Sequence, residues 1–122
     1  MANILVIDDD DQFRTMLVQM LTLDAHQVSI AIDGEMALSL LAQRLPELII
    51  TDILMPKMDG IELILELNRR KISVPIIAVS GGRRSISADF NLQSAALMGV
   101  KATLSKPFAR EDLRKAVAKA LD

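Results

Sequence analysis

The feature that most constrains the fold is an apolar run that ends abruptly on an acid. Residues 48–52 read Leu-Ile-Ile-Thr-Asp. A strand covered on both faces has such a continuous apolar run, whereas a strand with one wet face alternates between apolar and polar residues. Pro56 prevents a helix from starting at once, and the Asp-Gly pair at 59–60 provides turn chemistry. Asp52 is therefore expected at the end of a buried strand, beneath a stiff loop.

Four further segments have the pattern of a strand. They are Ile4–Ile7, Gln27–Ala31, Val74–Val79 and Ala102–Ser105. Helical periodicity follows each of the five expected strands, over residues 13–21, 36–41, 61–70, 88–98 and 113–121. This alternation predicts an α/β fold, a doubly wound five-stranded parallel sheet with right-handed crossovers. A chain of 122 residues has room for one such domain, spanning residues 1–122.

Composition excludes several classes of protein. The chain is 51% hydrophobic and only 2% aromatic, so its core is expected to be aliphatic. A net charge of −2 without a large Lys/Arg cluster argues against nucleic acid as a direct partner. The absence of cysteine excludes disulfides and thiol catalysis and fits a reducing cytoplasm. No stretch has the pattern of a signal peptide or membrane span, so we expect a soluble cytoplasmic domain with no membrane partner.

Chemically usable side chains follow four of the five expected strands, at the point where each strand ends. They are Asp8 and Asp9, Asp52, Ser80 and Lys106. In a parallel sheet, ligands bind in the crevice beyond the carboxyl ends of the strands. Taken singly, each residue has a simpler explanation, such as a buried ion pair between Lys106 and Asp52 or an acidic helix cap at Asp10 or Asp11. Their occurrence at four strand ends together favours a functional site.

The chemistry that these side chains suit is phosphoryl transfer with a metal ion. Three carboxylates match a hard divalent cation such as Mg²⁺ better than zinc, since the chain has no Cys and one His. A lysine, a metal ion and a hydroxyl group around one carboxylate are the parts needed to hold a phosphoryl group on it. Aspartate is a competent nucleophile toward phosphorus once the incoming oxygens are neutralised.

Four stretches, in this order and spacing, make the chain similar to a known family over essentially its whole length. They are Ile4–Asp10, Asp33–Leu38, Asp52–Gly60 and Lys106–Phe108. Together they resemble the receiver domain of two-component response regulators. The resemblance implies a flavodoxin-like sheet with strand order 2-1-3-4-5. It also implies a signalling phosphoacceptor, a monomer or weak dimer that turns over no independent substrate.

The resemblance further implies a role for each matching residue. Asp52 accepts a phosphoryl group from a phosphohistidine on a sensor histidine kinase or a histidine phosphotransfer protein. Asp9, Asp52 and the backbone carbonyl of Leu54 bind Mg²⁺ directly, while Asp8 contributes through water. Lys106 contacts the acyl phosphate, and Ser80 bonds a phosphoryl oxygen. Phosphorylation then changes the interaction with a downstream protein target.

Two features depart from the pattern of the family. Many relatives have an aromatic residue where this chain has Thr103, and a small β-branched side chain cannot fill the space that an aromatic ring would occupy. We therefore expect the switch to work through movement of the backbone near Ser80. The segment between Ser80 and Lys106 is also a few residues longer than is typical, with residues 81–85 as the expected insertion.

Three other functions remain as alternatives to a stand-alone phosphoacceptor. The chain is alternatively the receiver piece of a longer DNA-binding regulator or hybrid kinase. The Asp-x-Asp at 8–10 also fits the opening of haloacid-dehalogenase-like phosphohydrolases, although Gln12 stands where those enzymes have Thr or Val. A scaffold that ignores phosphate is less consistent with the presence of Asp52, Lys106 and Ser80 together.

Overall fold

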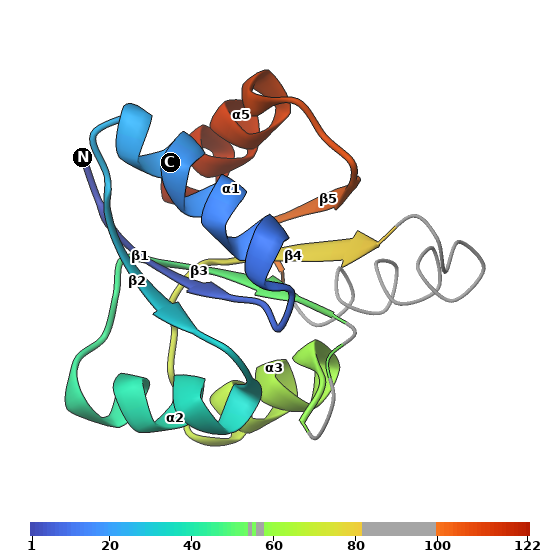
Figure 1. Ribbon diagram of the computed structural model, residues 1–122. Helices are drawn as coiled ribbons and strands as arrows, with labels where there is room; N and C mark the ends of the chain where they lie inside the picture. Colours follow the sequence, from blue (N-terminus) through green and yellow to red (C-terminus); the bar gives the residue numbers. More distant parts are fainter. Residues whose placement is uncertain (54, 56–57, 82–99) are drawn as a thin grey trace.

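The protein is a five-stranded parallel sheet covered by helices on both faces (Figure 1). The computed structural model describes residues 1–53, 55, 58–81 and 100–122. In chain order its elements are β1 (Asn3–Ile7), α1 (Asp11–Leu23), β2 (Gln27–Ala31), α2 (Gly34–Gln43), β3 (Leu48–Asp52), α3 (Gly60–Arg69), β4 (Ile76–Gly81), β5 (Ala102–Lys106) and α5 (Arg110–Leu121). The strand order is β2-β1-β3-β4-β5, which confirms the order 2-1-3-4-5.

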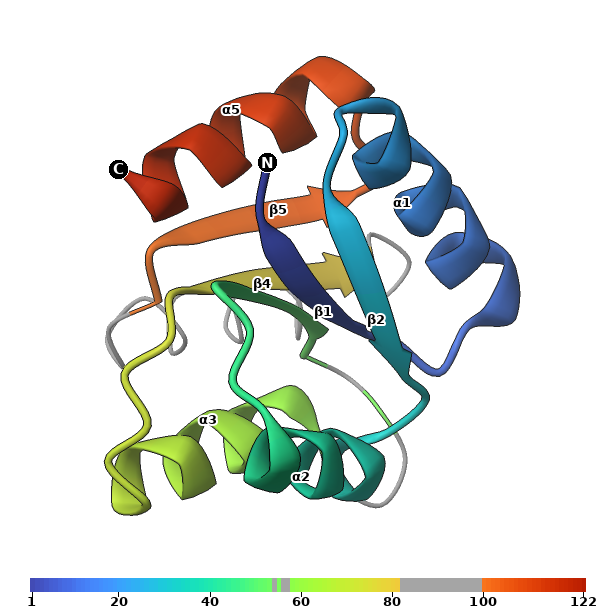
Figure 2. The same cartoon turned by 90° about the vertical axis from the view of Figure 1, so that its left-hand side faces the viewer.

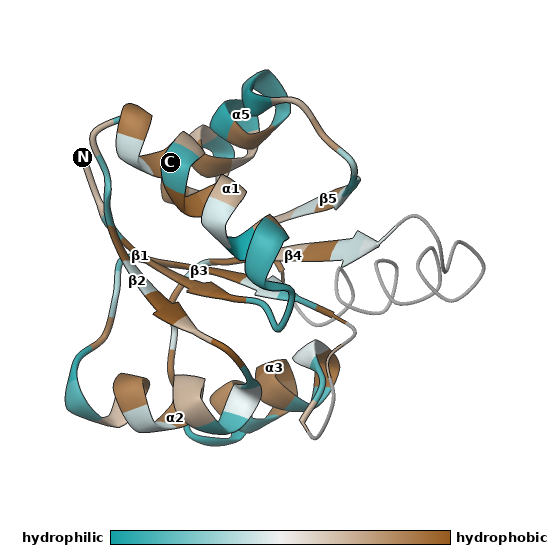
Figure 3. Cartoon of the chain, viewed as in Figure 1, coloured by the Kyte–Doolittle hydropathy of each residue, from teal (hydrophilic) through white to brown (hydrophobic). Residues whose placement is uncertain are grey.

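The two faces of the sheet are covered by different helices. Figures 1 and 2 show α1 and α5 on one face and α2 and α3 on the other. Because successive side chains of a strand point to opposite faces, β1 contributes to both layers. Ile4 and Val6 pack with the residues of α1 and α5, whereas Leu5 and Ile7 pack with those of α2 and α3. The continuous apolar colour of the central strands in Figure 3 reflects this burial on both sides.

The expected elements differ from the observed ones mainly at their ends. The fourth strand was expected from Val74 but begins at Ile76, because Pro75 has no N–H to donate to a neighbouring strand. The carbonyl of Pro75 still accepts a hydrogen bond from the Ile49 N–H at 2.9 Å. At the end of α5, Leu121 is 39% exposed, whereas Ala120 beside it is buried. The expected helix at 88–98 and most of the insertion at 81–85 lie outside the described residues.

Aspartate caps three of the helices at the same edge of the sheet. Asp10, Asp33 and Asp59 each accept backbone N–H groups from the first turn of α1, α2 and α3. The side-chain oxygen replaces hydrogen bonds that the helix itself cannot supply at its N-terminus. Asp10 is therefore the N-cap of α1, and neither Asp8 nor Asp9 has that role. Among the described helices, none is both long and apolar enough to cross a membrane.

Gly60, the first residue of α3, lies unusually close to the backbone of β3. Its N–H donates to the carbonyl of Ile53 at 2.7 Å, which joins the two ends of the segment that follows β3. A Cβ at this position would lie 2.3 Å from the backbone oxygen of Asp52. The close approach of the α3 backbone to the β3 backbone therefore requires glycine at this position, next to the last residue of β3, Asp52.

We expect Gly60→Ala to destabilise the fold, because a methyl group at this position forces the backbone of β3 and α3 apart. The expected loss is about 1 to 3 kcal/mol in the free energy of unfolding, measured by urea denaturation. Gly34→Ala is the matched control, since Gly34 also begins a helix after an Asp cap but the three atoms nearest to its Cβ would belong to the side chain of Met58, at 2.9 to 3.0 Å, and none to the backbone. Equal unfolding free energies for the two variants would contradict this account of Gly60.

Candidate functional site

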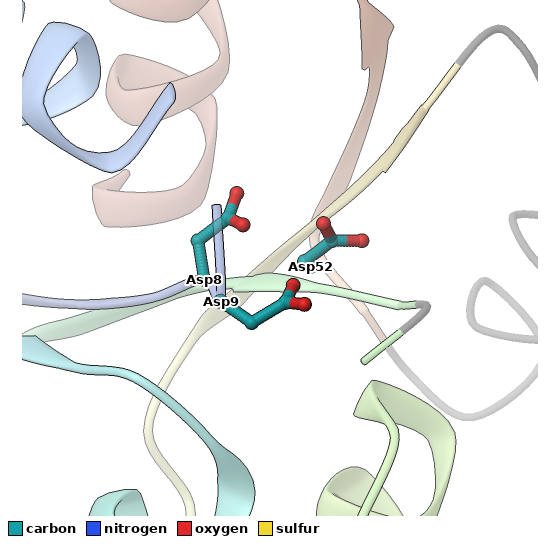
Figure 4. Close-up of side chains that lie close together, drawn as sticks. All are labelled: Asp8, Asp9 and Asp52. Atoms are coloured by element: carbon teal, nitrogen blue, oxygen red, sulfur yellow. The ribbon is translucent and has the colours of Figure 1, made fainter. Parts of the chain in front are cut away.

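Three carboxylates meet at the carboxyl ends of β1 and β3. Ile7 lies opposite Thr51 in the register of these neighbouring strands, so Asp8 and Asp52 follow at the same level of the sheet. Asp8, Asp9 and Asp52 each offer an oxygen within 4.8 Å of the others. Figure 4 shows the Asp9 carboxylate turned toward Asp52. We call these three residues the acidic cluster.

Lys106 brings one positive charge to this cluster from the end of β5. Its Nζ lies 3.0 Å from Oδ2 of Asp52 and 3.1 Å from Oδ2 of Asp8. The contact between Lys106 and Asp52 that the sequence suggested is therefore present. The Lys106 side chain is 17% exposed and that of Asp8 only 2%, so solvent screens these contacts weakly. A simple buried ion pair does not describe the site, because two further carboxylates share it.

Burial and the neighbouring charges shift the pKa values of Asp8 and Lys106. Burial of Asp8 raises the pKa of its carboxyl group from 3.8 to about 6. The N–H of Asp10 donates a hydrogen bond to the Asp8 carboxylate and acts to lower this pKa. The nearby charge of Asp52 raises the pKa further, and the charge of Lys106 acts to lower it. Burial also acts to lower the pKa of Lys106, but the charges of Asp52 and Asp8 outweigh burial and raise it. The ammonium is thus held in its charged form.

The acidic cluster has the donor set that a hard divalent cation requires. The site holds three carboxyl groups and one ammonium at the ends of β1, β3 and β5, so acidic groups outnumber the basic one. A cation such as Mg²⁺ binds through oxygen ligands and would neutralise that excess. The oxygens come from the ends of two neighbouring strands and lie within 4.8 Å of one another, so the residues present fit such an ion.

The remaining residues predicted from the sequence lie at other positions. Ser80 is fully buried near the end of β4, one residue after Val79, which lies opposite Asp52 in the register. Its hydroxyl has no hydrogen-bond partner within the described part of the chain. Thr103 is exposed in β5, opposite Ala78. Leu54 lies outside the described residues, so the expected role of its carbonyl stays a prediction.

Two residues of α1 contact the site, and these contacts were not predicted from the sequence. Arg14 Nη1 donates to the backbone carbonyl of Asp8 at 2.8 Å, which fixes the bend between β1 and α1. The Phe13 ring lies against the ammonium of Lys106, 3.9 Å from Nζ to the ring centroid. Phe13 has the helical spacing of a core residue, and no local pattern indicates a contact with a lysine 93 positions away.

Comparison with known proteins identifies the family. The family model described as the response regulator receiver domain matches residues 4–118. The chain is a response regulator receiver domain. Such domains belong to two-component systems, so the family that the four motifs resembled is confirmed. The strand order that the resemblance implied is the one observed in this receiver domain.

Relatives and solved structures support the same assignment. The receiver domain is 38% identical over 96 residues to the transcriptional regulatory protein AfsQ1 of Streptomyces coelicolor, covering 79% of this chain and 42% of that protein. It is 36% identical to the response regulator MprA of Mycobacterium sp. strain KMS, covering 92% of this chain and 47% of that protein. The receiver domain of NtrX from Brucella abortus superposes with a TM-score of 0.89 at 28% identity, covering 97% of each chain. The chain thus spans about half the length of these curated relatives.

We expect Asp8→Asn to stabilise the receiver domain at neutral pH when divalent cations are chelated. Because the folded-state pKa of Asp8 is raised to about 6, its ionisation opposes folding as pH rises from about 4 to above 6. The amide removes that charge, so the expected gain is about 1 to 3 kcal/mol at pH 7 and vanishes near pH 4. Thermal unfolding between these pH values measures it.

Asp9→Asn provides the control, since Asp9 is exposed whereas Asp8 is buried. A gain for Asp8→Asn that did not depend on pH, or an equal gain for Asp9→Asn, would show that burial of the Asp8 charge is not its cause.

Proposed function

We propose that this receiver domain is the phosphoacceptor of a histidine-to-aspartate phosphorelay. In this proposal Asp52 accepts a phosphoryl group from a phosphohistidine on a sensor histidine kinase or a histidine phosphotransfer protein, with Mg²⁺ as the cofactor. The phosphorylated form then changes its interaction with a downstream protein target. The domain spans residues 1–122 and acts as a signalling protein, not as an enzyme with an independent substrate.

One observation carries the proposal. The ammonium of Lys106 lies within hydrogen-bond distance of both Asp8 and Asp52, and Asp9 completes a set of ligands at the same edge. The ammonium, together with a divalent cation that these carboxylates would hold, would supply the positive charge that phosphoryl transfer to a carboxylate requires. Burying two carboxylates beside a third is unfavourable, and a domain that binds no phosphoryl group gains nothing from it.

The transfer step follows from the position of Asp52. A carboxylate oxygen of Asp52 forms the new P–O bond while the P–N bond of the phosphohistidine breaks. The electron pair of that bond stays on the imidazole nitrogen, which takes up one proton from solvent, so the donor leaves as neutral histidine. Lys106, 3.0 Å from Asp52, places its charge beside the arriving phosphoryl oxygens. The Mg²⁺ ion, when bound, neutralises charge on those oxygens.

The residues proposed to hold Mg²⁺ are Asp9, Asp52 and the carbonyl of Leu54, with Asp8 contributing through water. Ser80 is proposed to donate a hydrogen bond to a phosphoryl oxygen. Its support is a buried hydroxyl without a partner among the described residues, because such a group is costly unless a ligand or a conformational change satisfies it. With Thr103 in place of an aromatic residue, the change at Ser80 is expected to reach the surface through the backbone of β4.

The partners in this proposal are proteins. Direct binding of nucleic acid is not part of it, and the domain is expected to be a monomer or weak dimer in the cytoplasm. A second possibility is favoured by the relatives, whose length is about twice that of this chain. In that case the domain is the receiver part of a larger transcriptional regulator or hybrid kinase. The size of the native gene product distinguishes the two.

The test is incubation with acetyl phosphate and Mg²⁺, followed by the intact mass. We expect the wild type to gain one phosphoryl group, and we expect that gain to be lost in Asp52→Asn and after chelation of Mg²⁺. Asp59→Asn is the matched control, because Asp59 is the N-cap of α3 and asparagine caps a helix equally well.

Two results would overturn the proposal. A gain in mass that persists in Asp52→Asn would place the phosphoryl group elsewhere. Loss of the gain in Asp8→Asn alone, together with turnover of a phosphate ester, would instead favour a phosphohydrolase with Asp8 as its nucleophile.

A further inference from the structure

The aromatic residues beside Lys106 form a contact that the proposed function does not use. Phe13 lies in the first turn of α1, and its ring centroid is 3.9 Å from the ammonium nitrogen of Lys106. Phe108 follows Lys106 by two residues and meets the Phe13 ring edge to face, with centroids 5.6 Å apart and an interplanar angle of 83°. The ammonium therefore has carboxylates and an aromatic face as its neighbours.

We propose that Phe13 is a positioning residue that holds the ammonium of Lys106 beside Asp52. This inference rests on the proposed function, because it concerns how Lys106 is presented to the phosphoryl group. The negative face of an aromatic ring attracts a cation, and the attraction is stronger where water is excluded. Lys106 is 17% exposed, so the contact lies in such surroundings.

The backbone explains why the ring and the ammonium meet. Ala102 and Leu104 of β5 pack against the α1 and α5 side of the sheet, and Lys106 continues that alternation toward the same side. Phe13 is anchored there, because its N–H donates to the capping carboxylate of Asp10 at 3.1 Å. Phe108, packed on the same side, sets the orientation of the ring by its edge-to-face contact.

A lysine needs this kind of support more than the carboxylates do. Its ammonium ends a flexible four-carbon chain, whereas each aspartate has a short side chain fixed close to its strand. When a phosphoryl group arrives at Asp52, one carboxylate oxygen of the ion pair becomes part of an acyl phosphate and loses much of its charge. The ring does not change in this step, so it continues to hold the ammonium near the phosphoryl oxygens.

The experiment compares three variants of α1 in the intact domain. Phe13→Leu keeps an apolar side chain but removes the aromatic face, and Phe13→Met serves the same purpose if the leucine variant is unstable. Phe13→Tyr keeps the face. Met20→Ala is the packing control. Met20 is a partly buried residue of the same helix and packs against the same core cluster as Phe13.

Two measurements are made on each variant. The first is the NMR chemical shift of the Lys106 ε-methylene protons, which an adjacent ring face moves upfield. The second is the rate of phosphorylation by acetyl phosphate at saturating Mg²⁺. We expect Phe13→Leu to lose the upfield shift and to slow phosphorylation roughly threefold to thirtyfold. Phe13→Tyr should retain both values, and Met20→Ala should lower stability without changing the shift.

Several results would overturn the inference. The first is a Lys106 resonance of the wild type without an upfield shift. The second is phosphorylation of Phe13→Leu at the wild-type rate. The third is a Met20→Ala variant that is as stable as Phe13→Leu and is phosphorylated equally slowly. If the wild type takes no phosphoryl group from any donor, the proposed function fails and the role of Phe13 in transfer fails with it. The chemical shift still decides separately whether the ring holds the ammonium.

Discussion

The shared ion pair of Lys106 with Asp8 and Asp52 is the interaction on which the site depends. It joins the ends of three strands that lie far apart in the sequence, and it keeps one positive charge inside a group of carboxylates. Burial would otherwise make those charges unfavourable, as the raised pKa of Asp8 shows. The domain thus keeps an unfavourable charge arrangement at the one edge of the sheet where a parallel α/β fold binds ligands.

The rest of the fold positions this ion pair. Alternation along β1 and β3 covers both faces of the sheet with aliphatic side chains, so the polar residues are displaced to the strand ends. Gly60 allows α3 to begin against the carbonyl of Asp52, and Arg14 fixes the backbone of Asp8. The carboxylates are therefore held from the backbone side, while the flexible lysine depends on its neighbours, Phe13 among them.

Sequence patterns predict most of this architecture, and the reasons for the exceptions are physical. A strand with two buried faces and an aspartate helix cap leave local signatures, so β3, α2 and the order of the described elements follow from the residues alone. Convergence of Asp8, Asp52 and Lys106 follows from the parallel topology. The contact between Phe13 and Lys106 does not, because it depends on the three-dimensional relation of α1 to β5. At the end of α5 the buried position falls on Ala120 and Leu121 is exposed, which helical periodicity over residues 113–121 does not decide by itself.

The most direct test of the account is where a divalent cation binds. Mn²⁺ takes oxygen ligands as Mg²⁺ does, and it broadens the NMR signals of nearby nuclei. The account predicts that traces of Mn²⁺ broaden the backbone amide signals of Asp8, Asp9 and Asp52 first, and that excess Mg²⁺ restores them. Broadening centred elsewhere, for example at Glu66 on α3, or broadening that Mg²⁺ does not reverse, would contradict it.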